Sequence, residues 1–302
     1  MTLQMTSSLP TALHRSHLFV PGSDPRMMGK ALLAGADAVV LDLEDAVAPA
    51  AKQAARREVR NMIEQVAEDA SRSPGDVNVR INRRADGYDL DDLDAVVWPG
   101  LDGIRLPKVE SAGAVAAVAA QLDLLEHQRG LPTGRVSLYL GIETALGLEQ
   151  APATLRASER VIRAGLGTHD LLADLGAVGD DDLATLHASG QLVLLSRAAG
   201  TGPPSDTVFT DVGNDTGLER AARRARSLGF FGKAVIHPRQ IEAVHRVFTP
   251  TEDEVTHARA VVAAAARAID NGDGAVALDG QMIDEPIVHR ARAILALVEP
   301  TT

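Results

Sequence analysis

The sequence predicts an α/β protein, a (β/α)₈ TIM barrel with a C-terminal helical lid extension. Short apolar runs alternate with longer amphipathic stretches along most of the 302 residues, which is typical of parallel strands joined by helices. Eight such runs are present, and eight strands close into a barrel of about 250 residues. A doubly wound open sheet is the alternative for the same alternation.

The first half of the chain predicts four strands, each followed by a helix. β-branched and leucine residues gather in short runs without a helical period. These runs are residues 17–21, 38–43, 76–82 and 103–109. The first helix begins at Pro25, where Ser23 or Asp24 can cap it, and Gly35 stops it. Further helices are expected at residues 52–70, 89–97 and 112–127.

The second half continues the alternation. Its strands are expected at residues 136–142, 161–167, 206–212 and 232–238, and its helices at residues 183–199 and 217–228. The fifth strand of the chain leads directly into Glu143, and the sixth leads into Asp170. A buried strand is not expected to end on a lone acid without a reason, so these two positions are singled out.

About fifty residues follow the eighth strand, more than a closed barrel needs. They predict a helix at residues 254–270, a turn at 271–275 and a last helix from about Glu285. The expected parts are a disordered N-terminal tail at residues 1–14, a barrel catalytic domain at 15–250 and a lid or oligomerisation segment at 251–302. Asp284, just before the last helix, is an acid that such a lid could carry.

Composition excludes several kinds of function. Lys+Arg 30 against Asp+Glu 41 gives a net charge of −11, which disfavours nucleic acid or a membrane surface as the main partner. The chain has no cysteine, so disulfides, thiolate catalysis and cysteine-bound zinc are excluded. No stretch has the pattern of a signal peptide or of a membrane span, and a cytoplasmic location is expected.

Polar residues gather where the predicted strands end. They are Glu44, Asp45, Arg80, Lys108, Glu143, Asp170, Asp211 and His237. The carboxyl ends of barrel strands surround one mouth, where enzymes of this fold hold their active sites. Glu143 and Asp170 offer the oxygen ligands that Mg²⁺ prefers, with water and substrate filling the remaining positions. We therefore expect a magnesium site at this mouth.

These residues also have simpler interpretations. Glu143 and Asp170 can pair with cations at the rim of a barrel. Arg80 can neutralise Glu44 or Asp45. If the site is functional, we interpret Glu44 and Asp45 as groups that orient Arg80 or metal-bound water, rather than as ligands.

Several longer motifs resemble one known family. They are LFVPGSDPRMMGKAL, GADAVVLDLEDAVAP, VRIN, LPKVES, GIETALGLEQAP, GTHDLLADLG, GKAVIHPRQIEAVHRVFTP and DGQMIDEPIVHRA. In this order they extend from about Arg15 to Ala291, nearly the whole chain. The chain thereby resembles the citrate lyase β-subunit-like group of the HpcH/HpaI aldolase superfamily, which includes malyl-CoA and citramalyl-CoA lyases.

The resemblance implies a Mg²⁺-dependent lyase that cleaves a malyl-CoA or citramalyl-CoA type thioester to acetyl-CoA and a 2-oxo acid, or that catalyses the reverse condensation. On the matching positions Glu143 and Asp170 bind the metal, and Arg80 holds the 2-oxo acid during catalysis. It also implies a homotrimer or hexamer in which Asp284, from the neighbouring chain, is the catalytic acid/base. The other implied contacts with substrate or CoA are Phe19, Lys30, Ile236 and His237.

Three of the implied residues have simpler interpretations. Lys30 can be a solvated helix lysine, His237 can hold a structural hydrogen bond at a strand end, and Asp284 can be a helix N-cap.

The substrate stays open. A citrate lyase β-subunit would act on citryl attached to an acyl-carrier protein, and thioester hydrolysis after condensation is also possible. A CoA-independent 2-oxo-acid aldolase or a non-catalytic protein would fit the same barrel. Asp24, Arg83 and His169 depart from the family pattern, so the acyl group is not determined.

Overall fold

The computed structural model of the chain describes residues 14–73, 75–178, 182–271, 276–278 and 280–298. It divides into two compact units, His14–Phe248 and a second unit that includes Thr249–Thr302. The tail expected at residues 1–14 lies outside the described residues, apart from His14.

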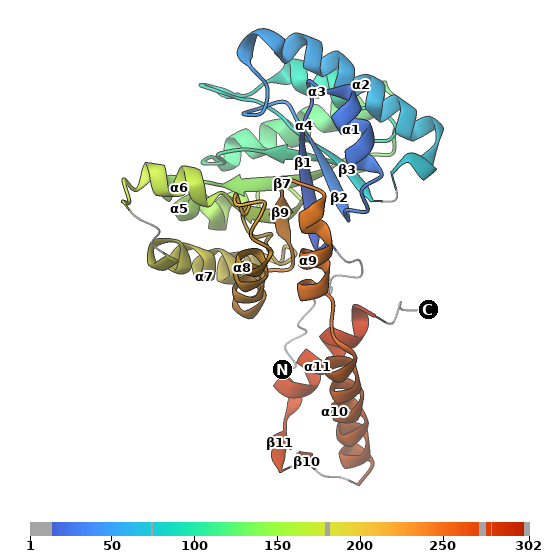
Figure 1. Cartoon of the computed structure of the whole chain (residues 1–302), viewed down its shortest axis with the longest axis vertical. Helices are drawn as coiled ribbons and strands as arrows, with labels where there is room; N and C mark the ends of the chain where they lie inside the picture. The colour runs from blue at the N-terminus through green and yellow to red at the C-terminus, as the bar shows by residue number, and fades with distance from the viewer. Residues whose placement is uncertain (1–13, 74, 179–181, 272–275, 279, 299–302) are drawn as a thin grey trace. The chain divides into compact units, whose positions relative to one another are not determined.

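Seven parallel strands form the sheet of the larger unit (Figure 1). They are β1 (Ser16–Pro21), β2 (Ala38–Asp42), β3 (Asp76–Arg80), β6 (Gly103–Leu106), β7 (Ser137–Ile142), β8 (Val161–Leu166) and β9 (Lys233–Val235). Their order across the sheet is β8-β7-β6-β3-β2-β1-β9. The strands from β1 to β8 therefore follow one another around the sheet in chain order, as the connections of a barrel require.

The two edges of this sheet meet through residues 205–206. Ser205 bridges Gly165 of β8, and Asp206 bridges Lys233 of β9, both in the parallel sense. The backbone N–H of Leu166 donates to the Ser205 carbonyl at 3.2 Å, and that of Ala234 donates to the Asp206 carbonyl at 2.9 Å. The two residues complete the ring in the place of an eighth strand, and the predicted barrel is confirmed.

The strand expected at residues 206–212 is wrong beyond Asp206. Ser205 lies opposite Gly165, so Asp206 lies opposite Leu166, where β8 ends. A longer strand would find no partner for its backbone groups on that side. The Phe209 carbonyl instead accepts a hydrogen bond from Gln240 Nε2 at 2.8 Å. Asp211, expected at the barrel mouth, is an exposed loop residue.

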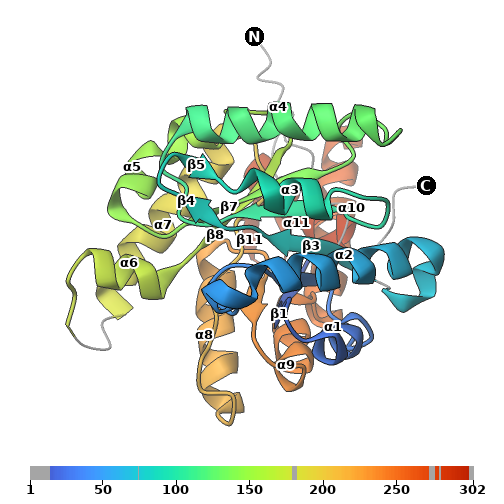
Figure 2. The ribbon, with the colours of Figure 1, turned by 90° about the horizontal axis from the view of Figure 1, so that it is seen from above.

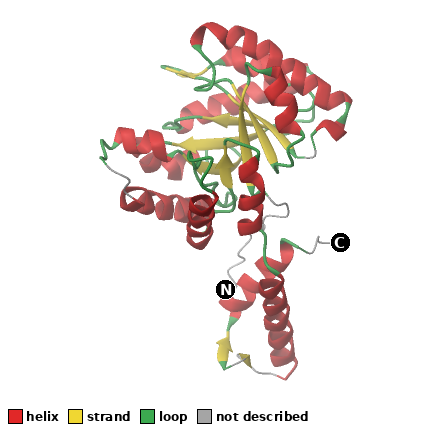
Figure 3. Cartoon of the chain, viewed as in Figure 1, coloured by secondary structure: helices red, strands yellow, loops and turns green. Residues whose placement is uncertain are grey.

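Helices surround the strands, as Figures 2 and 3 show. In the larger unit they are α1 (Pro25–Leu32), α2 (Lys52–Glu68), α3 (Leu90–Val96), α4 (Ala112–Gln128), α5 (Ala145–Thr154), α6 (Thr168–Asp174), α7 (Asp182–Ala199), α8 (Asp215–Leu228) and α9 (Arg239–Phe248). A short hairpin, β4 (Arg83–Arg84) with β5 (Gly87–Tyr88), follows β3. All five residues of β2 are buried, as expected for a strand covered on both faces.

Side-chain caps fix where several helices begin. Asp24 Oδ1 accepts from the Met27 N–H at 2.9 Å, which confirms it as the cap of α1. Thr144 Oγ1 accepts from the Gly147 N–H at 3.0 Å and starts α5 immediately after Glu143. The chain therefore turns away from the barrel axis at once, and Glu143 remains at the strand end.

Glu126 joins helix α4 to the start of β7. Its side chain is fully buried and accepts from Arg160 Nη1 at 2.9 Å and from the backbone N–H groups of Val136 and Gly134 at 2.8 Å. Arg160 is itself buried, with 7% of its side chain exposed. We expect Glu126→Gln to lower the free energy of unfolding by about 3 kcal/mol, because it leaves a buried guanidinium with less compensation. Urea unfolding measures this loss, and Glu68→Gln at an exposed position of α2 should change little.

The same variant has a defined pH dependence. Burial raises the pKa of Glu126, but the hydrogen bonds from Arg160 and the two N–H groups outweigh burial and hold the pKa below its ordinary 4.5. A lowered carboxyl pKa stabilises the fold fully above pH 4.5 and stops doing so as pH falls through the lowered value. The difference in the free energy of unfolding between wild type and Glu126→Gln should therefore become smaller at acid pH. A constant difference down to pH 3 would contradict this account.

The second unit contains α10 (Glu252–Asn271), the hairpin of β10 (Val276–Leu278) with β11 (Gln281–Ile283), and α11 (Glu285–Ala296). Its own apolar cluster consists of Ala258, Val261, Ile283, Val288 and Ala291. Of the turn expected at residues 271–275, only residue 271 is described. Among the described residues, none of the helices has both the length and the apolar character that crossing a bilayer requires.

Candidate active site

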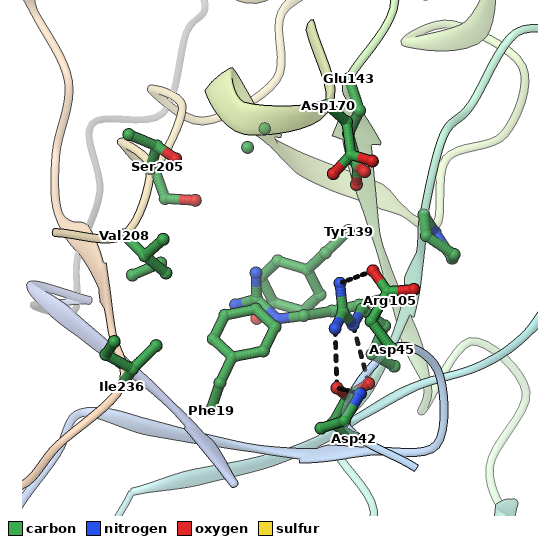
Figure 4. A pocket seen from close by; sticks show the side chains of 18 of the residues that line it. Phe19, Asp42, Asp45, Arg105, Tyr139, Glu143, Asp170, Ser205, Val208 and Ile236 are labelled. Carbon is green, nitrogen blue, oxygen red and sulfur yellow. Dashed lines mark hydrogen bonds and ion pairs between the residues drawn. The ribbon is translucent and has the colours of Figure 1, made fainter. Parts of the chain in front are cut away.

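A cavity of about 610 Å³ lies at the carboxyl ends of the barrel strands (Figure 4). Its size suits a small molecule. Its apolar lining includes Phe19, Leu106, Pro107, Leu140, Leu166, Val208 and Ile236. Its charged lining consists of Asp42, Asp45, Arg80, Arg105, Glu143, Asp170 and Asp206. The mouth expected from the strand-end residues therefore exists as a real cavity.

Arg80 is held by a carboxylate that the sequence did not single out. Asp42, the last residue of β2, is the lateral neighbour of Arg80 on β3. Arg80 Nε and Nη2 donate to the two Asp42 oxygens at 2.8 and 2.7 Å, a bidentate pair of fixed orientation. The same oxygens accept the backbone N–H groups of Glu44 and Ala46 at 2.9 and 3.1 Å. Asp42 thus fixes the orientation of the Arg80 side chain and also stabilises the turn after β2.

Glu44 and Asp45 also contact Arg80, as expected, but each of them contacts Lys108 as well. Arg80 Nη1 lies 2.8 Å from Glu44 Oε2 and 3.8 Å from Asp45 Oδ2. Lys108 Nζ lies 3.0 and 3.6 Å from the same two residues. Among the described residues other than glycine, Lys108 alone has a positive φ, at 48°. Such strain clusters at functional sites, and it brings the ammonium to the centre of this acidic group.

Glu143 and Asp170 converge on one side of the cavity, and Figure 4 shows their carboxyl groups beside each other. Lys108 Nζ lies 3.9 Å from Glu143 Oε2 and 3.4 Å from Asp170 Oδ1. Glycine is required at two neighbouring positions. A Cβ on Gly141 would stand 2.2 Å from Glu143 Oε1, and one on Gly167 would stand 2.5 Å from Glu143 Cγ. The chain therefore makes space for the Glu143 side chain on both sides.

The electrostatics of this group favour a hard cation. More carboxylates than cations meet here. Burial raises the pKa of Glu143 to about 7; Lys108 opposes this shift and Glu44 adds to it. No three acidic or histidine side chains of the described residues come together as a metal cage. Two carboxylates with further positions left to water and substrate are the arrangement that Mg²⁺ accepts, so Glu143 and Asp170 fit the ion.

The other predicted site residues divide into two groups. Phe19 and Ile236 line the cavity. Lys30 and His237 are exposed and do not line it. His237 Nδ1 accepts from the Arg239 N–H at 3.2 Å, which is the structural hydrogen bond expected of a strand-end histidine. In the second unit, Asp284 caps α11, because its Oδ1 accepts from the Ile287 N–H at 3.2 Å.

The chain matches two family models. The one described as HpcH/HpaI aldolase/citrate lyase covers residues 15–238. The other, described as a carbon–carbon bond lyase of the TIM-barrel fold, covers residues 195–297. Between them they account for the barrel and most of the second unit.

Individual relatives agree with these matches. The citrate lyase subunit beta of Leuconostoc mesenteroides subsp. cremoris is 37% identical, over 94% of this chain and 93% of the relative. The L-malyl-CoA/beta-methylmalyl-CoA lyase of Cereibacter sphaeroides is 32% identical, over 99% of each chain. The crystal structure of protein CitE from Mycobacterium tuberculosis in complex with magnesium, acetoacetate and coenzyme A gives a TM-score of 0.74 at 32% identity, over 94% of this chain and 98% of that one. These matches confirm the family that the motifs predict. The chain therefore belongs to the HpcH/HpaI aldolase/citrate lyase family and is a carbon–carbon lyase.

Proposed function

We propose that this chain is a Mg²⁺-dependent lyase that cleaves a malyl-CoA or citramalyl-CoA type thioester to acetyl-CoA and a 2-oxo acid, or catalyses the reverse condensation. The observation that carries the proposal is the convergence of Glu143 and Asp170 on the cavity that Arg80 also lines. The malyl-CoA lyase relative, similar along its whole length, and the neighbour crystallised with magnesium and coenzyme A support it.

Each residue has a role in this proposal. Glu143 and Asp170 hold the metal, which when bound supplies a Lewis acid for the carboxylate and hydroxyl oxygens of the substrate. Arg80, oriented by Asp42, donates to the oxygens of the 2-oxo acid as the carbonyl forms. Glu44 and Asp45 orient Arg80 and Lys108 rather than contact the substrate.

Protons must balance in either direction. When the carbon–carbon bond of the thioester breaks, the hydroxyl proton passes to solvent water, and the enolate of acetyl-CoA takes up a proton at carbon from a protonated carboxyl group. We assign this second transfer to Asp284, delivered from the 251–302 segment of a neighbouring subunit in a homotrimer or hexamer. In the condensation direction the same carboxylate removes the proton from acetyl-CoA.

The thioester itself needs contacts that reach beyond the cavity. Phe19 and Ile236 offer apolar surface within it. Lys30 and His237 are exposed, and the anionic phosphates of CoA are natural partners for a lysine. We further propose that the reaction takes place in the cytoplasm and involves neither nucleic acid nor a membrane.

A substrate panel tests the proposal. The protein is incubated with MgCl₂ and malyl-CoA or citramalyl-CoA, and acetyl-CoA release is followed by chromatography. We expect cleavage that ceases when EDTA removes the metal. Cleavage of a free 4-hydroxy-2-oxo acid without CoA would instead identify a 2-oxo-acid aldolase that is independent of CoA.

A second candidate is a citrate lyase β-subunit that acts on a citryl thioester of an acyl-carrier protein. The observation that favours it is the 37% identity to such a subunit over nearly the full length of both chains. Citryl-CoA in the same panel separates the two, because this candidate predicts that citryl-CoA is cleaved and malyl-CoA is not.

Asp284→Asn tests the acid/base. Asparagine caps a helix as well as aspartate does, so the start of α11 should persist. We expect turnover to fall by about 10²- to 10⁴-fold, the usual contribution of a general acid or base. Binding of a 2-oxo acid with Mg²⁺, measured by isothermal titration calorimetry, should be unchanged, because Asp284 contributes no metal ligand. Full turnover in this variant would remove Asp284 from the mechanism.

A further inference from the structure

Lys108, which follows β6, is shared by four carboxylates. Its Nζ lies 3.0 Å from Glu44 Oε1, 3.6 Å from Asp45 Oδ2, 3.4 Å from Asp170 Oδ1 and 3.9 Å from Glu143 Oε2. The shortest of these contacts, to Glu44, is a hydrogen bond, and the other three are longer ion pairs. One ammonium therefore links the two acids that follow β2 to the two acids that follow β7 and β8.

The backbone fixes the position of this ammonium. Lys108 has a φ of 48°, in the left-handed region that lysine rarely adopts. Such a conformation persists only where its surroundings impose it, and here both neighbours are held. Tyr88 Oη donates to the Pro107 carbonyl at 3.1 Å, and the Val109 N–H donates to the Gly141 carbonyl at 2.9 Å. The fold therefore maintains an unfavourable conformation that keeps the lysine side chain among the acids.

Lys108 acts on the carboxylates rather than on a substrate. Glu143, Asp170 and Asp45 line the cavity, whereas Lys108 does not. The carboxyl groups of Glu143 and Asp170 lie beside each other (Figure 4), and two such charges repel each other unless a cation shares them. Lys108 supplies this cation and leaves the cavity side of both groups free. It is therefore a positioning residue for these two acids.

We infer that Lys108 is the built-in counter-ion of the metal pair, which holds Glu143 and Asp170 together in the metal-free protein and weakens their binding of Mg²⁺. Both cations draw on the same carboxylates. Even at the dielectric constant of water, a unit charge about 6 Å from a divalent ion lowers the affinity for that ion by about tenfold. The inference rests on the proposed function, which assigns the metal to these two residues, and adds what sets the affinity of that site.

Lys108→Met tests the inference, because methionine keeps much of the side-chain length and removes the charge. Mg²⁺ is titrated by isothermal titration calorimetry into protein that EDTA has freed of metal. We expect the dissociation constant of Mg²⁺ to fall by about tenfold or more relative to wild type. Mg²⁺ carries twice the charge of a proton, so removal of Lys108 should favour the metal more than it favours protonation of Glu143.

Two further exchanges separate the charge from the backbone. Lys108→Arg keeps the charge and should bind Mg²⁺ within about threefold of wild type, because repulsion between the two cations remains. Lys108→Gly removes the charge and also relieves the left-handed backbone, and it should bind Mg²⁺ as tightly as Lys108→Met. Lys108→Gly also provides the comparison if Lys108→Met does not fold.

Thermal unfolding gives a second readout. Without metal, Lys108→Met should melt at a lower temperature than wild type, because four carboxylates lose their shared cation. MgCl₂ should raise the Tm of Lys108→Met more than that of wild type, because tighter binding to the folded state stabilises it more. Arg223→Gln removes a positive charge at an exposed position of α8 and should change neither the Mg²⁺ affinity nor the size of the MgCl₂ effect.

The outcomes distinguish the inference from the proposed function. Wild type that binds Mg²⁺, with Lys108→Met and Lys108→Gly binding it equally or less tightly, would refute the inference alone. A Lys108→Arg variant that gains as much affinity as Lys108→Met would also refute it, since charge would then not be the cause. If wild type binds no Mg²⁺ with or without pyruvate, the proposed function fails, and the inference fails with it.

Discussion

Glu143→Gln should reduce Mg²⁺-dependent turnover by more than about 100-fold. Glutamine keeps the shape that Gly141 and Gly167 accommodate, but its neutral amide is a poor ligand for a hard cation. Loss of a residue that only hydrogen-bonds to a metal ligand lowers metal affinity or activity by about 10- to 100-fold. Loss of the ligand itself should lower them further. The measurements are turnover against MgCl₂ concentration and the dissociation constant of Mg²⁺.

The fold should tolerate this exchange, which separates metal binding from stability. Burial raises the pKa of Glu143 to about 7, so its ionised form is disfavoured in the metal-free protein and its replacement should not lower the free energy of unfolding. Glu149→Gln, at an exposed position of α5, is the control and should leave turnover unchanged. A Glu143→Gln variant with the magnesium dependence of wild type would place the metal elsewhere.

Much of the barrel can be predicted because most of its strands are short runs rich in apolar residues. Residues 38–41 form such a run before Asp42, and all five residues are buried. The strand at residues 206–212 shows where this reasoning ends. Its alternation is a local property, but a strand persists only as far as its neighbours extend, and β8 ends at Leu166, opposite Asp206. A local sequence pattern does not show how long the neighbouring strand of the sheet will be.

The same distinction applies to the site. Glu143 and Asp170 can be found because each follows an apolar strand. Asp42 was missed, since its importance comes from its lateral register with Arg80, which depends on the fold. Arg105, which lines the cavity, carried a usable signal, a charge inside the run of residues 103–106, because charged residues are almost never fully buried unless they are paired. The exposure of Lys30 and His237 depends on packing, and the motifs alone did not indicate it.

Arg80→Met should lower kcat/KM by about 10²- to 10³-fold, the usual cost of removing a donor to developing oxyanion charge. A fall in kcat would mean that Arg80 acts mainly as the carbonyl forms, whereas a rise in KM alone would mean that it only binds the acid. The variant should also be less stable by about 3–5 kcal/mol, because Asp42 is 2% exposed and loses its cation. The effect of Arg80→Met on activity therefore has to be separated from its effect on stability.

The double variant Arg80→Met/Asp42→Asn makes that separation. With both charges removed, no uncompensated carboxylate remains at the end of β2, and asparagine can still accept the Glu44 N–H that Asp42 Oδ1 accepts. We expect the double variant to recover most of the stability that Arg80→Met loses, as measured by urea unfolding, yet to remain as inactive as the single variant. Recovery of activity together with stability would mean that Arg80 serves the fold alone. Loss of activity that persists in a restored fold means that Arg80 acts in the site itself and does not serve the fold alone.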